Sequence, residues 1–427
     1  MPKTNSNMKI VLINTSSKIG GAAIACRRLL VALNKSGHET KMLIRESENG
    51  INIVSTTTGK VKKWINFYRF ASERFLFFLR EKSKSVRFLF SIANVGENIS
   101  KHILLRTSNI IHLHWINQGF ISLQGINKIL KLNKPVVWTL HDMWSFTGGC
   151  HHSGDCNRFK ESCGNCPFLK SPSNRDLSNR IWKRKSRLLL SGNLTIVTCS
   201  KWLQEKAKES SLFRNVRVES IPNPIDTDVF IPKDKIVCKA EFNLQQNKKY
   251  LLFSAVNVRN YYKGFTFFRD ALKILADKYP SLKNEVDVVV LGRTSEELLN
   301  EMPLKCIVIN SISDESKMAS LYNLVDFYVT SSLQENLPNT IMESFACGTP
   351  VIAFNVGGIP EMVDHLQNGY LAEYKSADDL AKGIYWGLYE AHHDQLSSNA
   401  RDKVMACYSE EVVAETYISL YKELIRK

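Results

Sequence analysis

Short apolar runs alternate with longer amphipathic stretches along the whole chain. The first unit consists of the run KIVLIN (residues 9–14), a polar turn that contains Gly20 and Gly21, a stretch with helical spacing that ends at Gly37, and the run ETKMLI (residues 39–44). A strand, a glycine-containing turn, a helix and a second strand form a parallel unit. The pattern continues in further apolar runs, at residues 109–116, 135–140, 194–200 and 217–223.

The same alternation starts again after a linker-like segment, NPIDTDVFIPKD (residues 223–234). The predicted strands of this second half are residues 249–256, 286–292, 305–310, 326–332, 350–354 and 369–373. At 427 residues, the chain is long enough for two cores of roughly 200 residues each. We therefore predict two α/β domains, residues 1–222 and 223–407, and a final amphipathic helix at residues 408–427. A ligand is expected at the carboxyl ends of the strands.

Composition indicates a folded protein, because 44% of the residues are hydrophobic. No apolar run approaches the roughly 20 residues that a membrane-spanning helix needs. The opening residues contain a short apolar stretch that does not reach the length of a secretory leader. The sequence therefore predicts a cytoplasmic protein.

The net charge of +16 is unevenly distributed. Residues 1–222 hold 36 Lys and Arg against 13 Asp and Glu, a balance of +23, whereas the rest of the chain holds 21 against 28, a balance of −7. An excess of this size on one half indicates an anionic partner, either a lipid surface or nucleic acid. A basic surface that is merely solvated is the alternative.

The segment of residues 60–90 has the most distinctive charge pattern, with nine basic residues, two acidic residues and nine aromatic residues. Five aromatics recur at helical spacing, namely Trp64, Phe67, Tyr68, Phe75 and Phe78, with Lys63, Arg69, Arg74 and Arg80 between them. A basic amphipathic helix with an aromatic face is typical of segments that lie among lipid headgroups. A surface helix whose aromatics pack inward fits the pattern equally well. Nucleic acid ranks last, because no known nucleic-acid module accompanies the charge.

Two glutamates flank a predicted helix start in the segment SSLQENLPNTIMESFACGTPVIAF, residues 331–354. Pro338 suits the first helical turn, and Gly348 ends the helix. Glu335 is thus expected on the loop from strand to helix, with Glu343 about two turns further along. The amides of the helix start can hold phosphate oxygens, and ionised carboxylates are strong acceptors for sugar hydroxyls. The arrangement suits a sugar nucleotide.

This segment resembles the retaining glycosyltransferases of family 4. Their pattern is a glutamate, seven residues and a second glutamate, then a GTPV strand start, a GG.PE turn and a late NG strand entry. The chain carries these positions in order, as Glu335, Glu343, Gly348, Thr349, Pro350, Gly357, Gly358, Pro360, Glu361, Asn368 and Gly369. The resemblance covers nearly the whole chain. It implies the α/β GT-B fold, in which two Rossmann-like domains face each other across a cleft and a C-terminal helix crosses back to the first domain.

The resemblance also implies site residues. Gly20 and Gly21 correspond to the family's first glycine loop, which approaches the donor phosphate, and His141 in TLHDMW corresponds to the histidine that contacts the transferred sugar. Glu335 would bind the sugar hydroxyls and Glu343 the ribose. The remaining donor-binding residues implied are Lys263, which would neutralise the diphosphate, its partner arginine Arg259, and the helix-start residues Asn336, Leu337, Asn339 and Thr340.

The implied reaction is transfer of a glycosyl group from a UDP- or GDP-sugar with retention at the anomeric carbon, without a cofactor. The catalytic residues would be His141, Lys263 and Glu335. The basic first domain favours a glycan or lipid-linked oligosaccharide acceptor, used in cell-surface polysaccharide biosynthesis at the inner face of the cell membrane. A soluble small-molecule acceptor is the alternative.

Four of the ten cysteines are close together, at Cys150, Cys156, Cys163 and Cys166. Four thiols in a loop rich in glycine and polar residues predict a closed structural zinc site, and His151 or His152 could replace one ligand. We expect residues 148–170 to form an insertion beside His141. Free thiols or a disulfide pair are the alternatives. The histidines of HLHW (residues 112–115) are expected to pack at a strand end, not to bind metal.

Two other classes of protein fit less of the sequence. A nicotinamide or flavin oxidoreductase needs three spaced glycines in its first turn, which SSKIGGAA lacks. A zinc-containing nucleic-acid-binding protein would explain the basic half and the four cysteines, but it leaves the glutamate pair and the acidic second half unexplained. We therefore predict a glycosyltransferase that does not bind nucleic acid.

Overall fold

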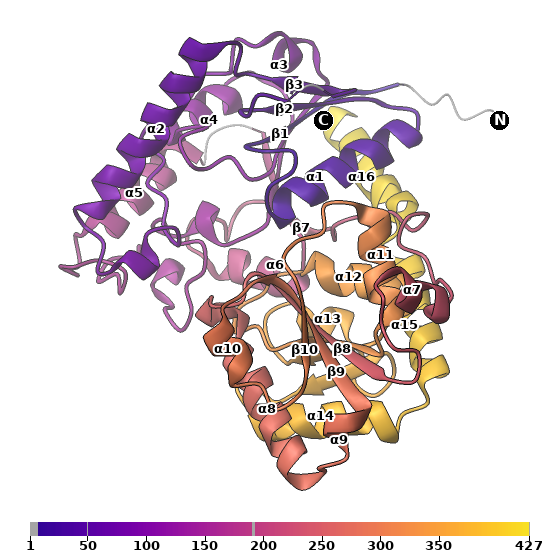
Figure 1. The fold of residues 1–427 in the computed structure, drawn as a ribbon. Helices are drawn as coiled ribbons and strands as arrows, with labels where there is room; N and C mark the ends of the chain where they lie inside the picture. The colour runs from indigo at the N-terminus through magenta and orange to yellow at the C-terminus, as the bar shows by residue number, and fades with distance from the viewer. Residues whose placement is uncertain (1–6, 49, 190–192, 427) are drawn as a thin grey trace. The chain divides into compact units, whose positions relative to one another are not determined.

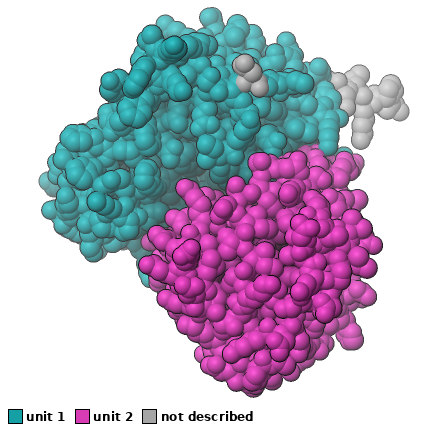
Figure 2. Space-filling model, viewed as in Figure 1, with its two compact units in different colours: residues 1–224, 413–427 teal, residues 225–412 magenta. Residues whose placement is uncertain are grey.

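The computed structural model describes residues 7–48, 50–189 and 193–426 (Figure 1). The first residues of the chain, on which part of the leader prediction depends, lie outside these ranges. The chain divides into two compact units (Figure 2): unit 1 is residues 1–224 and 413–427, and unit 2 is residues 225–412. Within the described ranges, every helix is too short or too polar to span a lipid bilayer.

Local contacts explain why the division falls just after the predicted boundary at Pro222. The Cys199 thiol donates to Asn223 Oδ1 at 3.1 Å, which holds Asn223 in unit 1. The Ile225 amide donates to the Tyr408 carbonyl at 2.9 Å, which fixes Ile225 in unit 2. The return to unit 1 falls at Val413, inside the terminal helix.

Unit 1 contains a seven-stranded parallel sheet in the order β3-β2-β1-β4-β5-β6-β7. Its strands are β1 (Lys9–Asn14), β2 (Glu39–Ile44), β3 (Ile53–Ser55), β4 (Ile110–Leu113), β5 (Val136–Leu140), β6 (Leu194–Thr198) and β7 (Val218–Ser220). Its helices are α1 (Gly21–Lys35), α2 (Lys60–Phe78), α3 (Ile103–Thr107), α4 (Leu123–Leu130), α5 (Leu177–Leu189), α6 (Lys201–Glu209) and α16 (Glu410–Arg426), the last of which begins in unit 2. The strand order reverses between β1 and β4.

Helices cover both faces of this sheet, because successive strand residues point to opposite sides. Ile10 and Leu12 of β1 belong to the core under α1 and α16, whereas Val11 and Ile13 belong to the core under α4, α5 and α6. Strands buried on both faces read as continuous apolar runs, which is why KIVLIN is recognisable in the sequence.

Unit 2 contains a six-stranded parallel sheet in the order β10-β9-β8-β11-β12-β13. Its strands are β8 (Lys249–Asn257), β9 (Val286–Arg293), β10 (Cys306–Ile309), β11 (Phe327–Thr330), β12 (Val351–Phe354) and β13 (Gly369–Ala372). Its helices are α7 (Lys235–Glu241), α8 (Phe265–Lys278), α9 (Leu282–Glu285), α10 (Glu296–Asn300), α11 (Glu315–Leu324), α12 (Asn339–Ala346), α13 (Ile359–Met362), α14 (Ala377–Tyr389) and α15 (His393–Cys407). Here the strand order reverses between β8 and β11.

Several helices start where a short polar side chain accepts a bond from the first turn. Ser122 caps α4, Ser200 caps α6 and Asp314 caps α11, each by accepting from the amide three residues later at 2.7–3.1 Å. Each such cap is worth about 1 kcal/mol. The α12 helix differs, because its start at Pro338 has no side-chain cap among the described residues.

Candidate functional site

The loops of unit 2 that follow β8 and β11 emerge at the point where the strand order reverses, which is where open α/β sheets bind ligands. Lys263 ends the short turn η4 (Tyr261–Lys263) after β8, and Glu335 lies between β11 and α12. Lys263 Nζ lies 2.6 Å from Glu335 Oε1. The charge of Glu335 raises the pKa of Lys263, outweighing the effect of burial. The structure therefore brings together two predicted residues 72 positions apart.

Two glycines allow these loops to pack closely. Gly264 has a φ of +68°, and a Cβ at this position would overlap the carbonyl oxygen of Ser331. Gly357 has a φ of +61°, and a Cβ there would overlap the carbonyl oxygen of Glu335. Both positions combine a left-handed backbone with a backbone contact that only glycine tolerates.

We expect Gly264→Ala to lower the free energy of unfolding by more than about 2 kcal/mol, because the side chain forces the two loops apart. Gly37→Ala is the matched control: Gly37 has a similar φ of +85° but no atom within 4 Å of the added Cβ. Its expected cost is about 1 kcal/mol, from backbone strain alone. Equal losses in urea unfolding of the two variants would contradict a role for the contact with Ser331.

The other predicted donor-binding residues of unit 2 surround the start of α12. Glu343 is only 7% exposed, and its Oε2 accepts from the Tyr322 hydroxyl at 3.0 Å. Thr340 Oγ1 bonds to the Tyr328 hydroxyl at 3.1 Å. Asn336 and Leu337 are buried on the loop before the helix, and Asn339 is its first residue. Arg259 lies exposed on the loop after β8.

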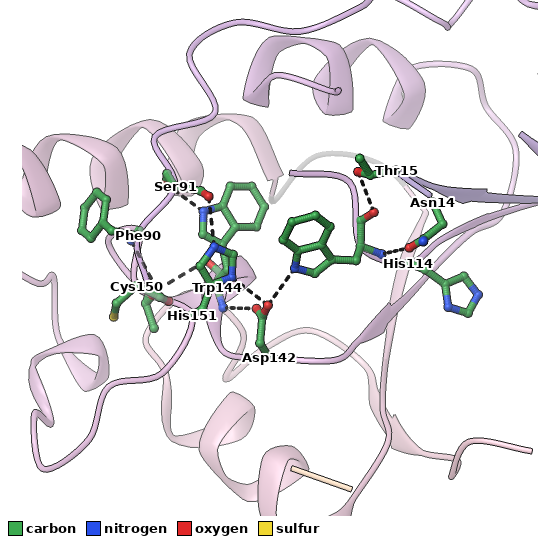
Figure 3. A network of polar contacts seen from close by, with 12 residues as sticks. Asn14, Thr15, Phe90, Ser91, His114, Asp142, Trp144, Cys150 and His151 are labelled. Carbon is green, nitrogen blue, oxygen red and sulfur yellow. Dashed lines mark hydrogen bonds and ion pairs between the residues drawn. The ribbon is translucent and has the colours of Figure 1, made fainter. Parts of the chain in front are cut away.

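In unit 1, hydrogen bonds connect the two loops at the corresponding reversal point, between side chains at the end of β1 and the backbone after β4 (Figure 3). Asn14 Oδ1 accepts from the Trp115 amide at 2.8 Å. The Thr15 hydroxyl lies 3.0 Å from the carbonyl oxygen of Trp115 and 3.1 Å from that of Asn117. The glycine loop follows: Gly20 has a φ of +91°, and Gly21 begins α1.

His141 follows β5, and both of its ring nitrogens have neighbours. Its Nε2 lies 3.1 Å from His114 Nδ1, and its Nδ1 lies 3.5 Å from Cys199 Sγ. Burial lowers the pKa of His141 to about 4 and that of His114 well below the usual value. Both rings are therefore neutral at pH 7. The sequence did not assign His114 to the site. His114 is the first residue after β4, and its spacing of two from His112 predicts that both side chains point to one side.

His112 lies on β4, two residues before His114, and is fully buried. Its Nδ1 lies 2.6 Å from the Tyr421 hydroxyl, and its Nε2 lies 2.7 Å from Thr139 Oγ1. Thr139 also bonds to the Tyr417 hydroxyl at 2.8 Å. As expected from the sequence, His112 is a packing residue.

Asp142 connects the end of β5 to the cysteine-rich insertion (Figure 3). It accepts from His151 Nδ1 at 2.7 Å, from Trp115 Nε1 at 3.0 Å and from the Trp144 amide at 2.8 Å. Burial favours the neutral acid, but the His151 interactions and the backbone bond outweigh it and lower the pKa of Asp142 to about 2. His151 Nε2 in turn lies 3.0 Å from Ser91 Oγ. The sequence did not single out Asp142 or this use of His151.

The four clustered cysteines, Cys150, Cys156, Cys163 and Cys166, line one small cavity of about 20 Å³. Burial raises the pKa of Cys150 to about 11 and those of Cys163 and Cys166 to about 12. Throughout the described ranges, no three His, Cys, Asp or Glu side chains are arranged to hold a metal ion. The thiols thus converge as expected without forming a ligand set, and the zinc site stays a prediction.

Both units therefore have the Rossmann-like arrangement, with polar loops at the reversal point of a parallel sheet. The family described as "Glycosyl transferases group 1" matches residues 237–403, and "Glycosyltransferase Family 4" matches residues 19–229. The chain belongs to the glycosyltransferases of the GT-B fold.

Curated relatives agree with this family. An uncharacterised glycosyltransferase of Haemophilus influenzae is 30% identical over 202 residues, which cover 45% of this chain and 52% of that protein. The Escherichia coli protein WcaC, described as a putative colanic acid biosynthesis glycosyl transferase, is 25% identical over 74% of this chain and 76% of its own length. The match spans about half the length of the Haemophilus protein.

Solved structures share the fold over the whole chain. Sucrose-phosphate synthase from Thermosynechococcus elongatus has a TM-score of 0.70 at 18% identity, covering 98% of this chain and 99% of its own. Anabaena HepE in complex with UDP-glucose has a TM-score of 0.62 at 14% identity, covering 98% and 100%. At these identities the likeness concerns the fold alone.

Proposed function

We propose that the protein transfers a sugar from a nucleotide-sugar donor to a glycan or lipid-linked acceptor, with retention at the anomeric carbon. The observation that carries this proposal is the Lys263–Glu335 ion pair on the two loops at the reversal point of unit 2. A cation and an anion held side by side suit a ligand with a diphosphate at one end and hydroxyls at the other.

In this proposal, Lys263 neutralises the donor diphosphate as the bond to the anomeric carbon breaks. Glu335 accepts from the sugar hydroxyls, Glu343 accepts from the ribose, and the α12 start, with Asn336, Leu337, Asn339 and Thr340, surrounds the phosphates. Arg259 is available on the same loop as Lys263. The Tyr322 hydroxyl fixes the Glu343 carboxylate and thus pre-orients it.

Retention is proposed to occur because the acceptor displaces the nucleoside diphosphate on the same face of the sugar ring. The acceptor oxygen bonds to the anomeric carbon while the phosphate oxygen leaves from the same side, and the leaving diphosphate takes the acceptor proton. Glu335 is held by Lys263 and Glu343 by Tyr322, so neither carboxylate is assigned as a nucleophile. His141, which is neutral at pH 7, would form a hydrogen bond to the sugar without adding charge if the sugar replaces His114 or Cys199 as its partner. Gly20 and Gly21 leave backbone room for the phosphate.

The donor is proposed to be a UDP- or GDP-sugar. The fold is shared with a protein crystallised with UDP-glucose, which supports UDP as the first choice. We expect selective slow hydrolysis of one donor in a screen of UDP-, GDP- and ADP-sugars, measured as released nucleoside diphosphate. Glu335→Gln serves as the control for contaminating hydrolases. If no donor is hydrolysed or raises the unfolding temperature, the proposal is wrong.

The acceptor is proposed to be a lipid-linked oligosaccharide of a cell-surface polysaccharide. The WcaC relative supports a polysaccharide pathway, and the excess of 23 positive charges in residues 1–222 suits an acceptor carried by an anionic surface. Activity on a small soluble acceptor, and none on lipid-linked glycans, would favour the alternative.

A further inference from the structure

The outward face of α2 carries many exposed apolar side chains. The outer stripe of α2 consists of residues at helical spacing, in two groups separated by seven positions, that are each at least 43% exposed: Val61, Trp64, Ile65, Tyr68, Phe75, Leu76 and Leu79, the last immediately after the helix. The opposite face, with Asn66, Glu73 and Phe77, is buried in unit 1. The sequence left open whether the aromatics face inward or outward, and the structure shows that most of them face outward, whereas the buried residues are Phe77 and the polar Asn66, Glu73 and Arg74.

Aromatic side chains gather on and beside the outer stripe. Trp64 lies 6.3 Å from Tyr68 and 6.0 Å from Phe67, and Phe75 lies 6.4 Å from Phe78, measured between ring centroids. Phe67 is 55% and Phe78 is 45% exposed. Exposed apolar side chains gathered on one helix face in this way mark an interaction surface.

The exposed charges of the α2 segment are positive, and the carboxylate of Glu97 is paired with Lys62 at 2.6 Å. Lys60, Lys63, Arg80, Lys82 and Lys84 are exposed. The only acidic residues between positions 60 and 90 are Glu73 and Glu81, which are buried. Their carboxylates are also occupied: Glu73 Oε1 accepts from the amides of residues 92 and 93 at 2.9 and 3.0 Å, and Glu81 is paired with Arg87.

We propose that α2 attaches the protein to an anionic lipid bilayer, with the outer stripe among the acyl chains near the headgroups and the lysines on lipid phosphates. Trp and Tyr next to aliphatic residues and Lys suit this boundary, where one end of each side chain is apolar and the other is wet. Basic residues near such a surface add an electrostatic attraction that salt weakens.

Charge and shape favour lipid over the other occupants. A second copy would bring two faces with a net positive charge together, and like charges repel. Nucleic acid would pair its phosphates with the lysines and stack its bases on the aromatic rings. It would leave Val61, Ile65, Leu76 and Leu79 in contact with water, whereas acyl chains would bury them. The attachment does not depend on glycosyl transfer and is measured without donor or acceptor.

The test is sedimentation of the full chain with vesicles of phosphatidylcholine and phosphatidylglycerol, compared with vesicles of phosphatidylcholine alone. We expect binding to the anionic vesicles that weakens as salt rises, and at least a ten-fold loss of affinity in the triple variant Trp64→Ser, Tyr68→Ser, Phe75→Ser. These side chains are exposed, so the thermal unfolding midpoint should not fall. The matched control is Ile236→Ser, Val237→Ser, which removes two residues of α7 in unit 2 that are 65% and 64% exposed.

Trp64→Phe gives a direct readout of depth. It should keep vesicle affinity but lose most of the tryptophan quenching caused by brominated lipids. Equal vesicle binding by the triple variant and the parent would overturn the proposal. Retention on single-stranded DNA without vesicle binding, or a dimer that the triple variant abolishes, would overturn it in favour of nucleic acid or a second copy.

Discussion

Replacing Glu335 with glutamine is expected to lower kcat/KM for sugar transfer by about a thousand-fold, on the order of 4 kcal/mol. Glutamine keeps the shape but removes the charge that holds Lys263 Nζ at 2.6 Å. It also removes the strong acceptor proposed for the sugar hydroxyls. The measurement is the initial rate of transfer, or of donor hydrolysis while the acceptor is unidentified.

The control for this substitution is Glu296→Gln, an exposed glutamate on α10 of the same unit. It makes the same chemical change away from the reversal point and should keep the parent rate. Urea unfolding should show that Glu335→Gln remains folded. A Glu335→Gln variant with the parent rate would refute the assignment of Glu335.

Unit 1 is expected to lose stability as the pH falls from about 6.5 toward 4. Burial lowers the pKa of His112 to about 3 and that of His141 to about 4, and it lowers the pKa of His114 as well. In this range the histidines bind protons in the unfolded chain but not in the folded protein. The contribution of these histidines to the free energy of unfolding is therefore fully present above pH 6.5 and declines below it. Each unit of pKa shift corresponds to about 1.4 kcal/mol. Asp142 adds no loss in this window, because its lowered pKa makes its contribution disappear only at still lower pH.

The measurement is the thermal unfolding midpoint at several pH values between 7.5 and 5. His112→Gln is expected to make this midpoint less dependent on pH, whatever its effect on absolute stability. His392→Gln, a substitution at an exposed position in unit 2, should leave the dependence unchanged. An unfolding midpoint that stays constant across the range would show that these rings are not kept neutral by the fold.

The parts of the fold that follow from local pattern could be predicted from the sequence. Strands buried on both faces, such as β1 and β8, appear as apolar runs, and Gly348 ends α12 with a φ of +74° as expected. The strand β3 was not predicted, because three residues of intermediate burial give no periodic signal. The position of Glu335 between β11 and α12 also followed from pattern and turn residues alone.

The pairings within the site could be predicted only in part. The resemblance suggested Lys263 and Glu335 separately, but their contact depends on the packing of two loops around Gly264. The pairs His114 with His141 and Asp142 with His151 depend on strand register and on the path of the insertion. The side on which the α2 aromatics are exposed depends on which face of the helix is buried. That face contains Asn66, Glu73 and Arg74, and polar residues in a sequence pattern normally indicate the exposed face.

The terminal helix α16 places Tyr417 and Tyr421 in the core of unit 1, against Thr139 and His112. During synthesis the amino-terminal half therefore leaves the ribosome with one sheet face covered by α1 but not yet by α16, and its packing is complete only after residues 413–426 are made. A chain that ends before residue 413 is consequently expected to have a less stable unit 1, because the apolar face that α16 covers is then exposed to water.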